Sequence, residues 1–142
     1  MTEILCTRKI EFDAGHRVRE HEHRCAFVHG HRYVAEFTFQ AEQLDRLGRV
    51  VDFGVIKERL QNWIDDNWDH TCVLHEADSE LGTFIAEFTG QKIFYLPYNP
   101  TAEQMALYLL EEICPKLFPE KSLRCVSVLL RETPNCSAEV RL

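Results

Sequence analysis

Alternating hydrophobic and polar positions predict strands near both ends of the chain. The stretches from Thr2 to Phe12 and from His31 to Gln40 place apolar side chains at every second position. Two further strand-like runs, Leu123 to Arg131 and Ser137 to Leu142, are separated by turn residues. Four strands are therefore expected, in two pairs.

Helical spacing lies between these pairs of strands. Val55 to Asn67 carries one apolar stripe, and Thr101 suits the start of a second helix that Pro115 is expected to close. Residues 81–88 fit a short helix and residues 92–96 a short strand. The order predicts an α+β fold, an antiparallel sheet with two main helices on one face, in a single domain spanning residues 1–142.

Composition narrows the class of protein. With 45% hydrophobic and 27% charged residues in 142 positions, the chain fits one globular domain. No apolar run reaches the roughly 18 residues of a membrane span, and the start of the chain lacks the apolar core of a signal peptide, so a cytoplasmic protein without a membrane partner is expected. The net charge of −7 argues against nucleic-acid binding. The six scattered cysteines are expected to be reduced thiols.

Charge is distributed unevenly. Between Arg8 and Arg32, six basic residues stand against four acidic ones, in a chain with 16 basic and 23 acidic residues overall. This segment is either a solvated basic edge or the place where a small anionic substrate binds.

Five of the seven histidines also fall in this segment, at positions 16, 21, 23, 29 and 31. Residues two apart in a strand point to the same side, so His29 and His31 present two imidazoles to one ion if the strand extends back to His29. His16, at the end of the preceding strand, is a candidate third ligand. Three nitrogens leave a fourth position free, as a catalytic zinc site requires.

Other ligand sets have to be weighed. His21 and His23 share the same spacing, and Cys25 is a good zinc ligand in its own right. The alternative interpretation is that these histidines are surface residues of a polar loop and bind no metal. It fits His21 and His23, because charged residues flank them. It fits His29 and His31 less well, because they border a hydrophobic strand.

Two further features suit proton transfer. Cys25 lies in a charged loop beside Arg24, where a guanidinium and a metal favour a thiolate, whereas the cysteines in apolar runs fit the core. Asp69 stands directly before His70 and is placed to orient its imidazole, although a cap at the end of the helix is the plainer interpretation.

These residues together resemble a known family. Phe12 to His16 and Cys25 to His31 are similar to the F-x-A-x-H and C-x-x-x-H-G-H signatures of the 6-pyruvoyltetrahydropterin synthases. The similarity continues, in the order of the family, through residues 51–57, 69–70, 99–103 and 131–133. The resemblance covers nearly the whole chain.

The resemblance implies a fold, an assembly and a site. The fold is the tunnelling fold, in which subunits form an oligomeric barrel, commonly a homohexamer built as a dimer of trimers, with active sites between subunits. His16, His29 and His31 would bind zinc, Cys25 would be the proton-abstracting thiolate, and His70 with Asp69 would relay protons. Glu132 would anchor the pterin and take part in the relay, and Thr101 and Glu103 would line the pterin pocket.

The spacing of Cys25 indicates a branch of the family. Only three residues separate it from His29, which resembles the bacterial carboxy-forming type rather than the animal pyruvoyl-forming type. The carboxy-forming reaction converts 7,8-dihydroneopterin triphosphate to 6-carboxy-5,6,7,8-tetrahydropterin, with release of acetaldehyde and triphosphate, toward queuosine. The alternatives are a 6-pyruvoyltetrahydropterin synthase and a catalytically silent zinc-bound interaction module. The stretch between His75 and Tyr98 is longer than in compact bacterial members.

Overall fold

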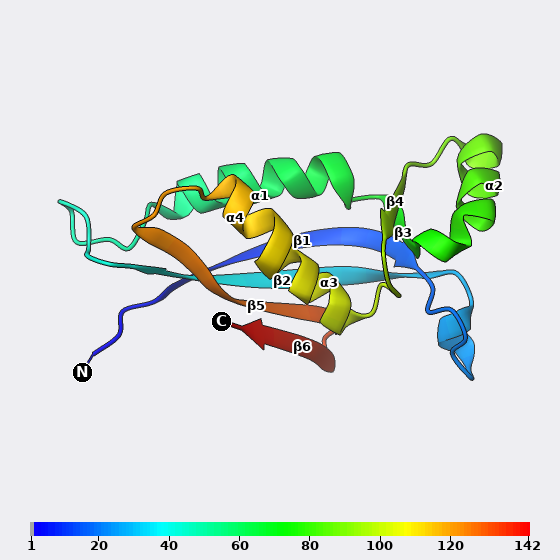
Figure 1. The fold of residues 1–142 in the computed structure, drawn as a ribbon, viewed down its shortest axis with the longest axis horizontal. Coiled ribbons are helices and arrows are strands. Elements are labelled where there is room, and N and C mark those ends of the chain that lie inside the picture. Colours follow the sequence, from blue (N-terminus) through cyan, green and yellow to red (C-terminus); the bar gives the residue numbers. More distant parts are fainter. Residues whose placement is uncertain (1) are drawn as a thin grey trace.

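A six-stranded sheet runs along the molecule, as Figure 1 shows for the computed structural model, which describes residues 2–142. The strands are β1 (Cys6–His16), β2 (His29–Ala41), β3 (Thr71–His75), β4 (Ile93–Leu96), β5 (Leu123–Thr133) and β6 (Cys136–Arg141). Their order across the sheet is β4-β3-β1-β2-β5-β6. The two long central strands, β1 and β2, form its axis.

Pairing in the sheet is antiparallel except at one edge. β1 pairs antiparallel with β2, β2 with β5, and β5 with β6, whereas β3 is parallel to β1 and β4 is parallel to β3. The predicted α+β fold is confirmed, and the sheet is mixed. β3 was not predicted, because four of its five residues are buried and its sequence does not alternate.

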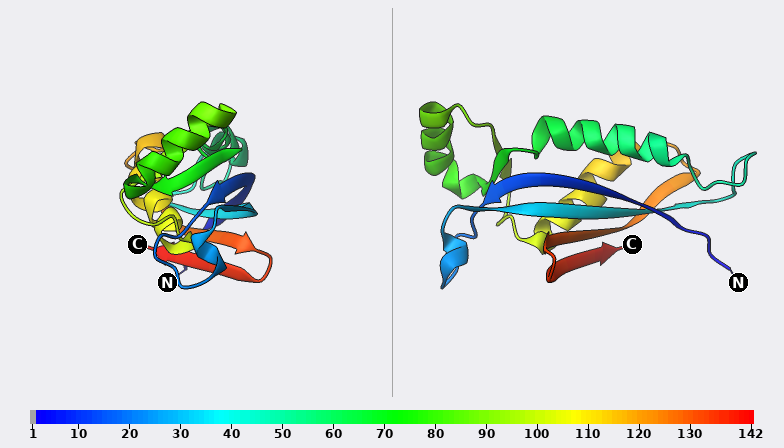
Figure 2. Two further views of the ribbon diagram at one scale, coloured as in Figure 1. Left: turned by 90° about the vertical axis from the view of Figure 1, so that its right-hand side faces the viewer. Right: turned by 180° about the vertical axis from the view of Figure 1, so that it is seen from behind.

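Helices cover one face of the sheet. α1 (Phe53–Asn67) and the run formed by α3 (Ala102–Tyr108), η3 (Leu109–Ile113) and α4 (Cys114–Leu117) lie on that face, and α2 (Ser79–Thr89) stands at one end (Figures 1 and 2). The short helix and short strand expected at 81–88 and 92–96 are confirmed as α2 and β4. Within residues 2–142, no helix is long and apolar enough to cross a membrane.

The second main helix does not close at Pro115, and that expectation is wrong. The chain makes a π-helical turn, η3, and then continues into α4, where Pro115 falls in the first turn. Proline has no N–H to donate, and here it follows directly on the π turn, where the regular hydrogen-bond pattern of the α-helix is already interrupted. The helical run therefore extends to Leu117.

The core lies between the sheet and the covering helices. Phe12, Tyr33, Phe37 and Phe39 project from β1 and β2 and are fully buried, and Trp68 packs against Phe12 from the end of α1. This alternation along β1 and β2 was predicted from the sequence.

The ends of β1 differ from those predicted. It starts at Cys6 instead of Thr2 and continues past Phe12 to His16. The added residues bring the end of β1 alongside the start of β2, so His16 lies opposite His29.

Candidate metal centre and active site

Three histidines meet where β1 ends and β2 begins. His16 lies opposite His29 in the strand register, and His31 follows two positions along β2. The strand predicted from His31 begins two residues earlier, at His29, which meets the condition under which His29 and His31 share a side of the sheet. One ring nitrogen from each of the three residues lies within 4.8 Å of the others. We call this group the histidine triad.

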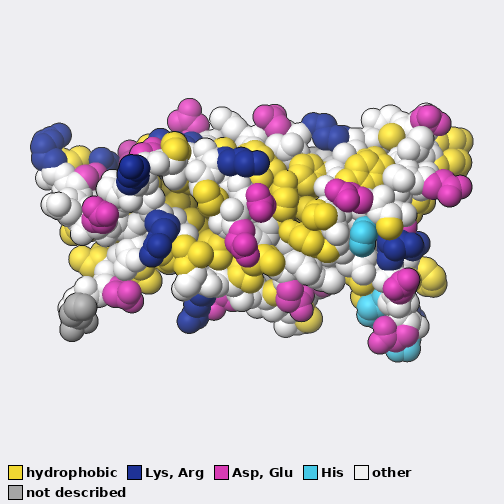
Figure 3. Space-filling view, viewed as in Figure 1, with side chains coloured by type: hydrophobic (Ala, Val, Ile, Leu, Met, Phe, Trp, Pro, Cys, Tyr) yellow, Lys and Arg dark blue, Asp and Glu magenta, His cyan; other side chains and the backbone are white. Residues whose placement is uncertain are grey.

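Histidines gather visibly at this end of the molecule in the space-filling view (Figure 3). Acidic and basic side chains lie beside them on this face.

Backbone carbonyl groups orient two rings of the triad. Pro100 O lies 2.7 Å from His16 Nδ1, and Phe27 O lies 2.7 Å from His29 Nδ1. A carbonyl oxygen only accepts, so each Nδ1 carries the hydrogen and each Nε2 presents a lone pair. The two Nε2 atoms are 3.1 Å apart. A cation held by both nitrogens relieves the repulsion between these lone pairs.

Burial favours the neutral, metal-binding form of His16 and His31. Burial lowers the pKa of His16 to about 4, with Pro100 opposing and the other two imidazoles reinforcing the shift. Burial also lowers the pKa of His31, which Glu132 opposes. Neutral imidazoles are ligands for zinc and other borderline-soft divalent metals. His31 Nε2 is buried without a hydrogen-bond partner in residues 2–142, so the donor set fits such an ion.

A carboxylate on β5, that of Glu132, lies against the histidine triad. Glu132 Oε1 lies 3.3 Å from His16 Nε2 and 3.6 Å from His31 Nε2. The side chain is 27% exposed, so part of the carboxylate remains open to a ligand. The structure thus brings Glu132 to the histidine triad, although 101 positions of sequence separate it from His31.

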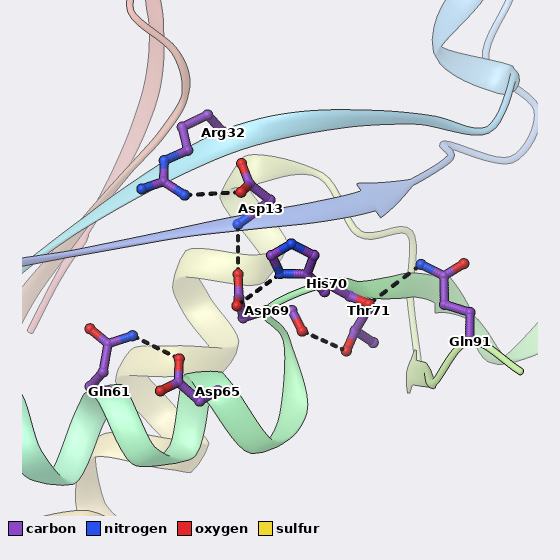
Figure 4. A network of polar contacts seen from close by, with 8 residues as sticks. All are labelled: Asp13, Arg32, Gln61, Asp65, Asp69, His70, Thr71 and Gln91. Carbon is purple, nitrogen blue, oxygen red and sulfur yellow. Dashed lines mark hydrogen bonds and ion pairs between the residues drawn. The ribbon is translucent and has the colours of Figure 1, made fainter.

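His70 is held by its neighbour, as Figure 4 shows. His70 takes a left-handed backbone conformation with φ 57°, and its N–H donates to Asp13 O at 2.6 Å. Asp69 Oδ2 accepts from His70 Nδ1 at 2.9 Å, and Asp69 Oδ1 accepts from Asp13 N–H at 2.9 Å. The expected Asp69–His70 pair is formed. Asp13, which Arg32 contacts at 3.0 Å, is a partner that the sequence did not indicate.

Hydrogen bonding sets the charges of this pair. The hydrogen bond to Asp69 raises the pKa of His70. Burial works against the ionisation of Asp69, but the hydrogen bonds from Asp13 N–H and from His70 outweigh it and lower the pKa of Asp69. The His70 side chain is 77% exposed, so its imidazole can exchange protons with a ligand or with solvent.

The histidine triad and the Asp69–His70 pair form separate groups. His70 lines a shallow depression of about 370 Å³ together with Asp13, Arg32 and one residue of the triad, His31. Asp13 and Arg32 alternate along β1 and β2 with His16 and His31, so these two pairs of side chains point to opposite faces of the sheet. One chain does not bring His70 onto the triad.

Cys25 lies in the loop between β1 and β2, within the single turn η1 (Arg24–Ala26). It is half-buried, and its backbone O accepts from Val18 N–H at 2.8 Å. Of the residues that the structure describes, neither potential metal group includes Cys25, His21 or His23. The alternative ligand sets therefore receive no support from the geometry.

The turn before α3 contacts the triad through the carbonyl group of Pro100. Thr101 Oγ1 accepts from Gln104 N–H at 3.1 Å and so caps α3, while the preceding Pro100 orients His16. Glu103 is exposed in the first turn of the same helix. The role of Pro100 was missed because a main-chain carbonyl has no signature in the sequence.

Two arginines of the basic segment already have a partner. Arg17 Nε lies 3.0 Å from Asp78 Oδ2, and Arg19 Nε lies 3.2 Å from Asp78 Oδ1. These two residues are thus engaged within the fold, whereas Arg24 is exposed.

Comparison with known proteins gives consistent matches. A family described as "6-pyruvoyl tetrahydropterin synthase" matches residues 5–142. A Rickettsia bellii protein named 6-carboxy-5,6,7,8-tetrahydropterin synthase is 53% identical over 137 residues, covering 96% of this chain and 99% of that protein.

Solved structures share the fold. An uncharacterized protein from Wolinella succinogenes superposes with a TM-score of 0.82 at 21% identity, covering 99% of both chains. A Plasmodium vivax 6-pyruvoyltetrahydropterin synthase, with a catalytic glutamate replaced by cysteine, gives a TM-score of 0.70 at 18% identity, again over 99% of both chains.

Proposed function

Because this chain belongs to the 6-pyruvoyl tetrahydropterin synthase family, we propose that it is a 6-carboxy-5,6,7,8-tetrahydropterin synthase. It would convert 7,8-dihydroneopterin triphosphate to 6-carboxy-5,6,7,8-tetrahydropterin, with release of acetaldehyde and triphosphate, toward queuosine and other deazapurines. The observation that carries the proposal is the histidine triad with Glu132 against it. The name of the R. bellii relative and the spacing of Cys25 from His29 support the carboxy-forming branch.

The histidine triad is the proposed zinc site. When bound there, zinc would supply Lewis-acid polarisation of the side-chain oxygens of the substrate. Pro100 and Phe27 hold two of the rings through Nδ1, which leaves Nε2 for the ion. Support for zinc comes from three imidazole nitrogens that lie together, with burial favouring the neutral form of His16 and His31.

The protein's own residues would divide the remaining tasks. The Glu132 carboxylate, partly exposed beside the triad, would accept N–H groups from the aminopyrimidinone edge of the pterin. Thr101 and Glu103 would line the pterin pocket from the start of α3. The Cys25 thiolate would remove a proton from the substrate side chain. The proposal places the enzyme in the cytoplasm, where such thiols stay reduced.

A second proton carrier would come from a neighbouring subunit. Asp69 orients His70 and favours its protonated form, which suits a residue that holds and returns a proton. Within one chain, however, the Asp69–His70 pair and the histidine triad form two separate groups. We infer that the pair from a second copy completes the site, in a homohexamer built as a dimer of trimers.

Product identification tests this function. The purified zinc-loaded protein is incubated with 7,8-dihydroneopterin triphosphate, and the products are identified by mass spectrometry. The expected result is 6-carboxytetrahydropterin together with acetaldehyde. A product that keeps its side chain would instead identify a 6-pyruvoyltetrahydropterin synthase. No turnover by fully zinc-loaded protein would indicate a silent binding module.

A further inference from the structure

The loop that carries Cys25 is tied to the segment before α2. Asp78, at the end of the short turn η2 (Glu76–Asp78), is only 8% exposed. Each of its carboxylate oxygens faces a different guanidinium, Oδ2 at 3.0 Å from Arg17 Nε and Oδ1 at 3.2 Å from Arg19 Nε. Both Nε atoms and Asp78 Oδ2 are buried and make no hydrogen bond in residues 2–142, so these contacts are ion pairs between opposite charges. The carboxylate therefore joins two residues of the loop at once.

The Asp78 carboxylate contacts these arginines instead of capping its own helix, α2. It stands at the N-cap position of α2, where a carboxylate usually accepts a hydrogen bond from the first turn. Its side chain makes no such bond. The carboxylate is thus directed away from the helix and toward the loop.

From the two arginines, a short series of contacts leads to Cys25. Val18 lies between Arg17 and Arg19, and its N–H donates to Cys25 O at 2.8 Å. Asn99 holds the backbone of Arg19 from the other side, since its Oδ1 accepts from Arg19 N–H at 2.9 Å and its Nδ2 donates to Arg19 O at 3.1 Å. Residues 17–19 are therefore fixed by side chains from two separate segments.

We propose that Asp78 is a positioning residue, which sets the place of the Cys25 thiol through Arg17, Arg19 and Val18. The proposal assigns a function to one residue, Asp78, of the segment between His75 and Tyr98. It rests on the proposed function, because it requires Cys25 to take part in the reaction.

Asp78→Asn tests the proposal with little change in volume. An amide accepts from one arginine and presents an N–H₂ to the other, so residues 17–25 lose part of their restraint. Displacement of a reacting group by about 1 Å can cost roughly 100-fold in rate, and we expect kcat to fall roughly 10- to 100-fold. KM should stay within about 2-fold and zinc content should not change, because the triad and Glu132 do not contact Asp78.

Hydrogen–deuterium exchange provides a readout that does not depend on turnover. In Asp78→Asn, the peptide covering residues 17–25 should exchange faster, while peptides from the centre of β2 should not. Asp78→Glu, which keeps the carboxylate, should recover most of the lost kcat. Glu80→Gln is the matched control, because Glu80 is an exposed acid in the first turn of the same helix and should behave as the wild type.

The outcomes separate this proposal from the proposed function. If Cys25→Ala is inactive but Asp78→Asn keeps the wild-type kcat, the positioning role is refuted and the function stands. If Cys25→Ala is fully active, Asp78 has no catalytic thiol to position, and both fail. Should Asp78→Asn not fold, Arg19→Gln removes one of the two ion pairs and should lower kcat with KM unchanged, and a wild-type kcat there would equally refute the proposal.

Discussion

His31 is the member of the triad whose Nε2 is buried without a hydrogen-bond partner in residues 2–142. We expect His31→Ala to weaken zinc binding by at least about 100-fold, because only two imidazoles of the triad then remain. Metal analysis of the purified protein and competition with a chelator measure this. His23→Ala, exposed and outside the triad, should keep its metal. One tightly held zinc per chain in His31→Ala would contradict the ligand assignment.

The charge of His70 depends on a single neighbour. Asp69→Asn should lower the pKa of the His70 imidazole toward its ordinary value, because the hydrogen bond that His70 donates to the Asp69 carboxylate is the main cause of its rise. In the wild type, a raised folded-state pKa stabilises the fold below the unfolded pKa of about 6.5, and this contribution is lost as the pH rises through the folded value. NMR titration of the His70 ring measures the shift.

A control and a contrary outcome accompany that titration. Asp65→Asn changes a carboxylate of α1 that contacts Gln61 and should leave the His70 titration as it is. An unchanged His70 pKa in Asp69→Asn would show that the two side chains are uncoupled in solution.

Side-chain chemistry at the site was predictable from the sequence, and main-chain chemistry was not. The triad, Glu132 and the Asp69–His70 pair were identified from residue type, spacing and resemblance. The carbonyl groups of Pro100 and Phe27 were not, because every residue has a carbonyl and only the fold decides which one faces an imidazole. The contacts of Asp78 were not predicted either, although side chains make them. Its partners come from a loop about 60 positions earlier, and only the fold brings the two segments together.

Among the elements, the start of α3 links stability to the site. Thr101→Ala removes the hydrogen bond to Gln104 N–H, and we expect a loss of about 1 kcal/mol in the free energy of unfolding. Urea denaturation at a fixed protein concentration measures the loss. Thr83→Ala, an exposed position inside α2, should change stability by less than about 0.5 kcal/mol. Equal effects of the two substitutions would show that the cap contributes nothing.

The elements that the sequence predicted are those with a clear period. β2 and α1 follow the periods of a strand with one buried face and of an amphipathic helix. β3 has no period, because it lies between two parallel neighbours and nearly all of it is buried. The continuation of the second main helix past Pro115 depends on a π turn, which no local pattern announces.

For the whole molecule, the separation of His70 from the triad predicts an experiment with mixed subunits. Cys25→Ala and His70→Ala should each be inactive alone. If each site takes Cys25 from one chain and His70 from another, random assembly of equal amounts restores both groups at about a quarter of the sites. Activity of co-refolded mixtures measures this. If mixed oligomers are shown to contain both variant chains and still have no activity, the complete site would lie within one chain.

The facing nitrogens of His16 and His29 also have a thermodynamic consequence. These residues stand opposite each other in the register and close the base of the loop from Arg17 to Val28. A metal held there would bind the folded chain in preference to the unfolded one, so folding would be linked to metal supply by mass action. The free energy of unfolding would then rise by about 1.4 kcal/mol for each tenfold increase in free metal above the dissociation constant. Metal starvation would therefore shorten the lifetime of the protein as well as stop its chemistry.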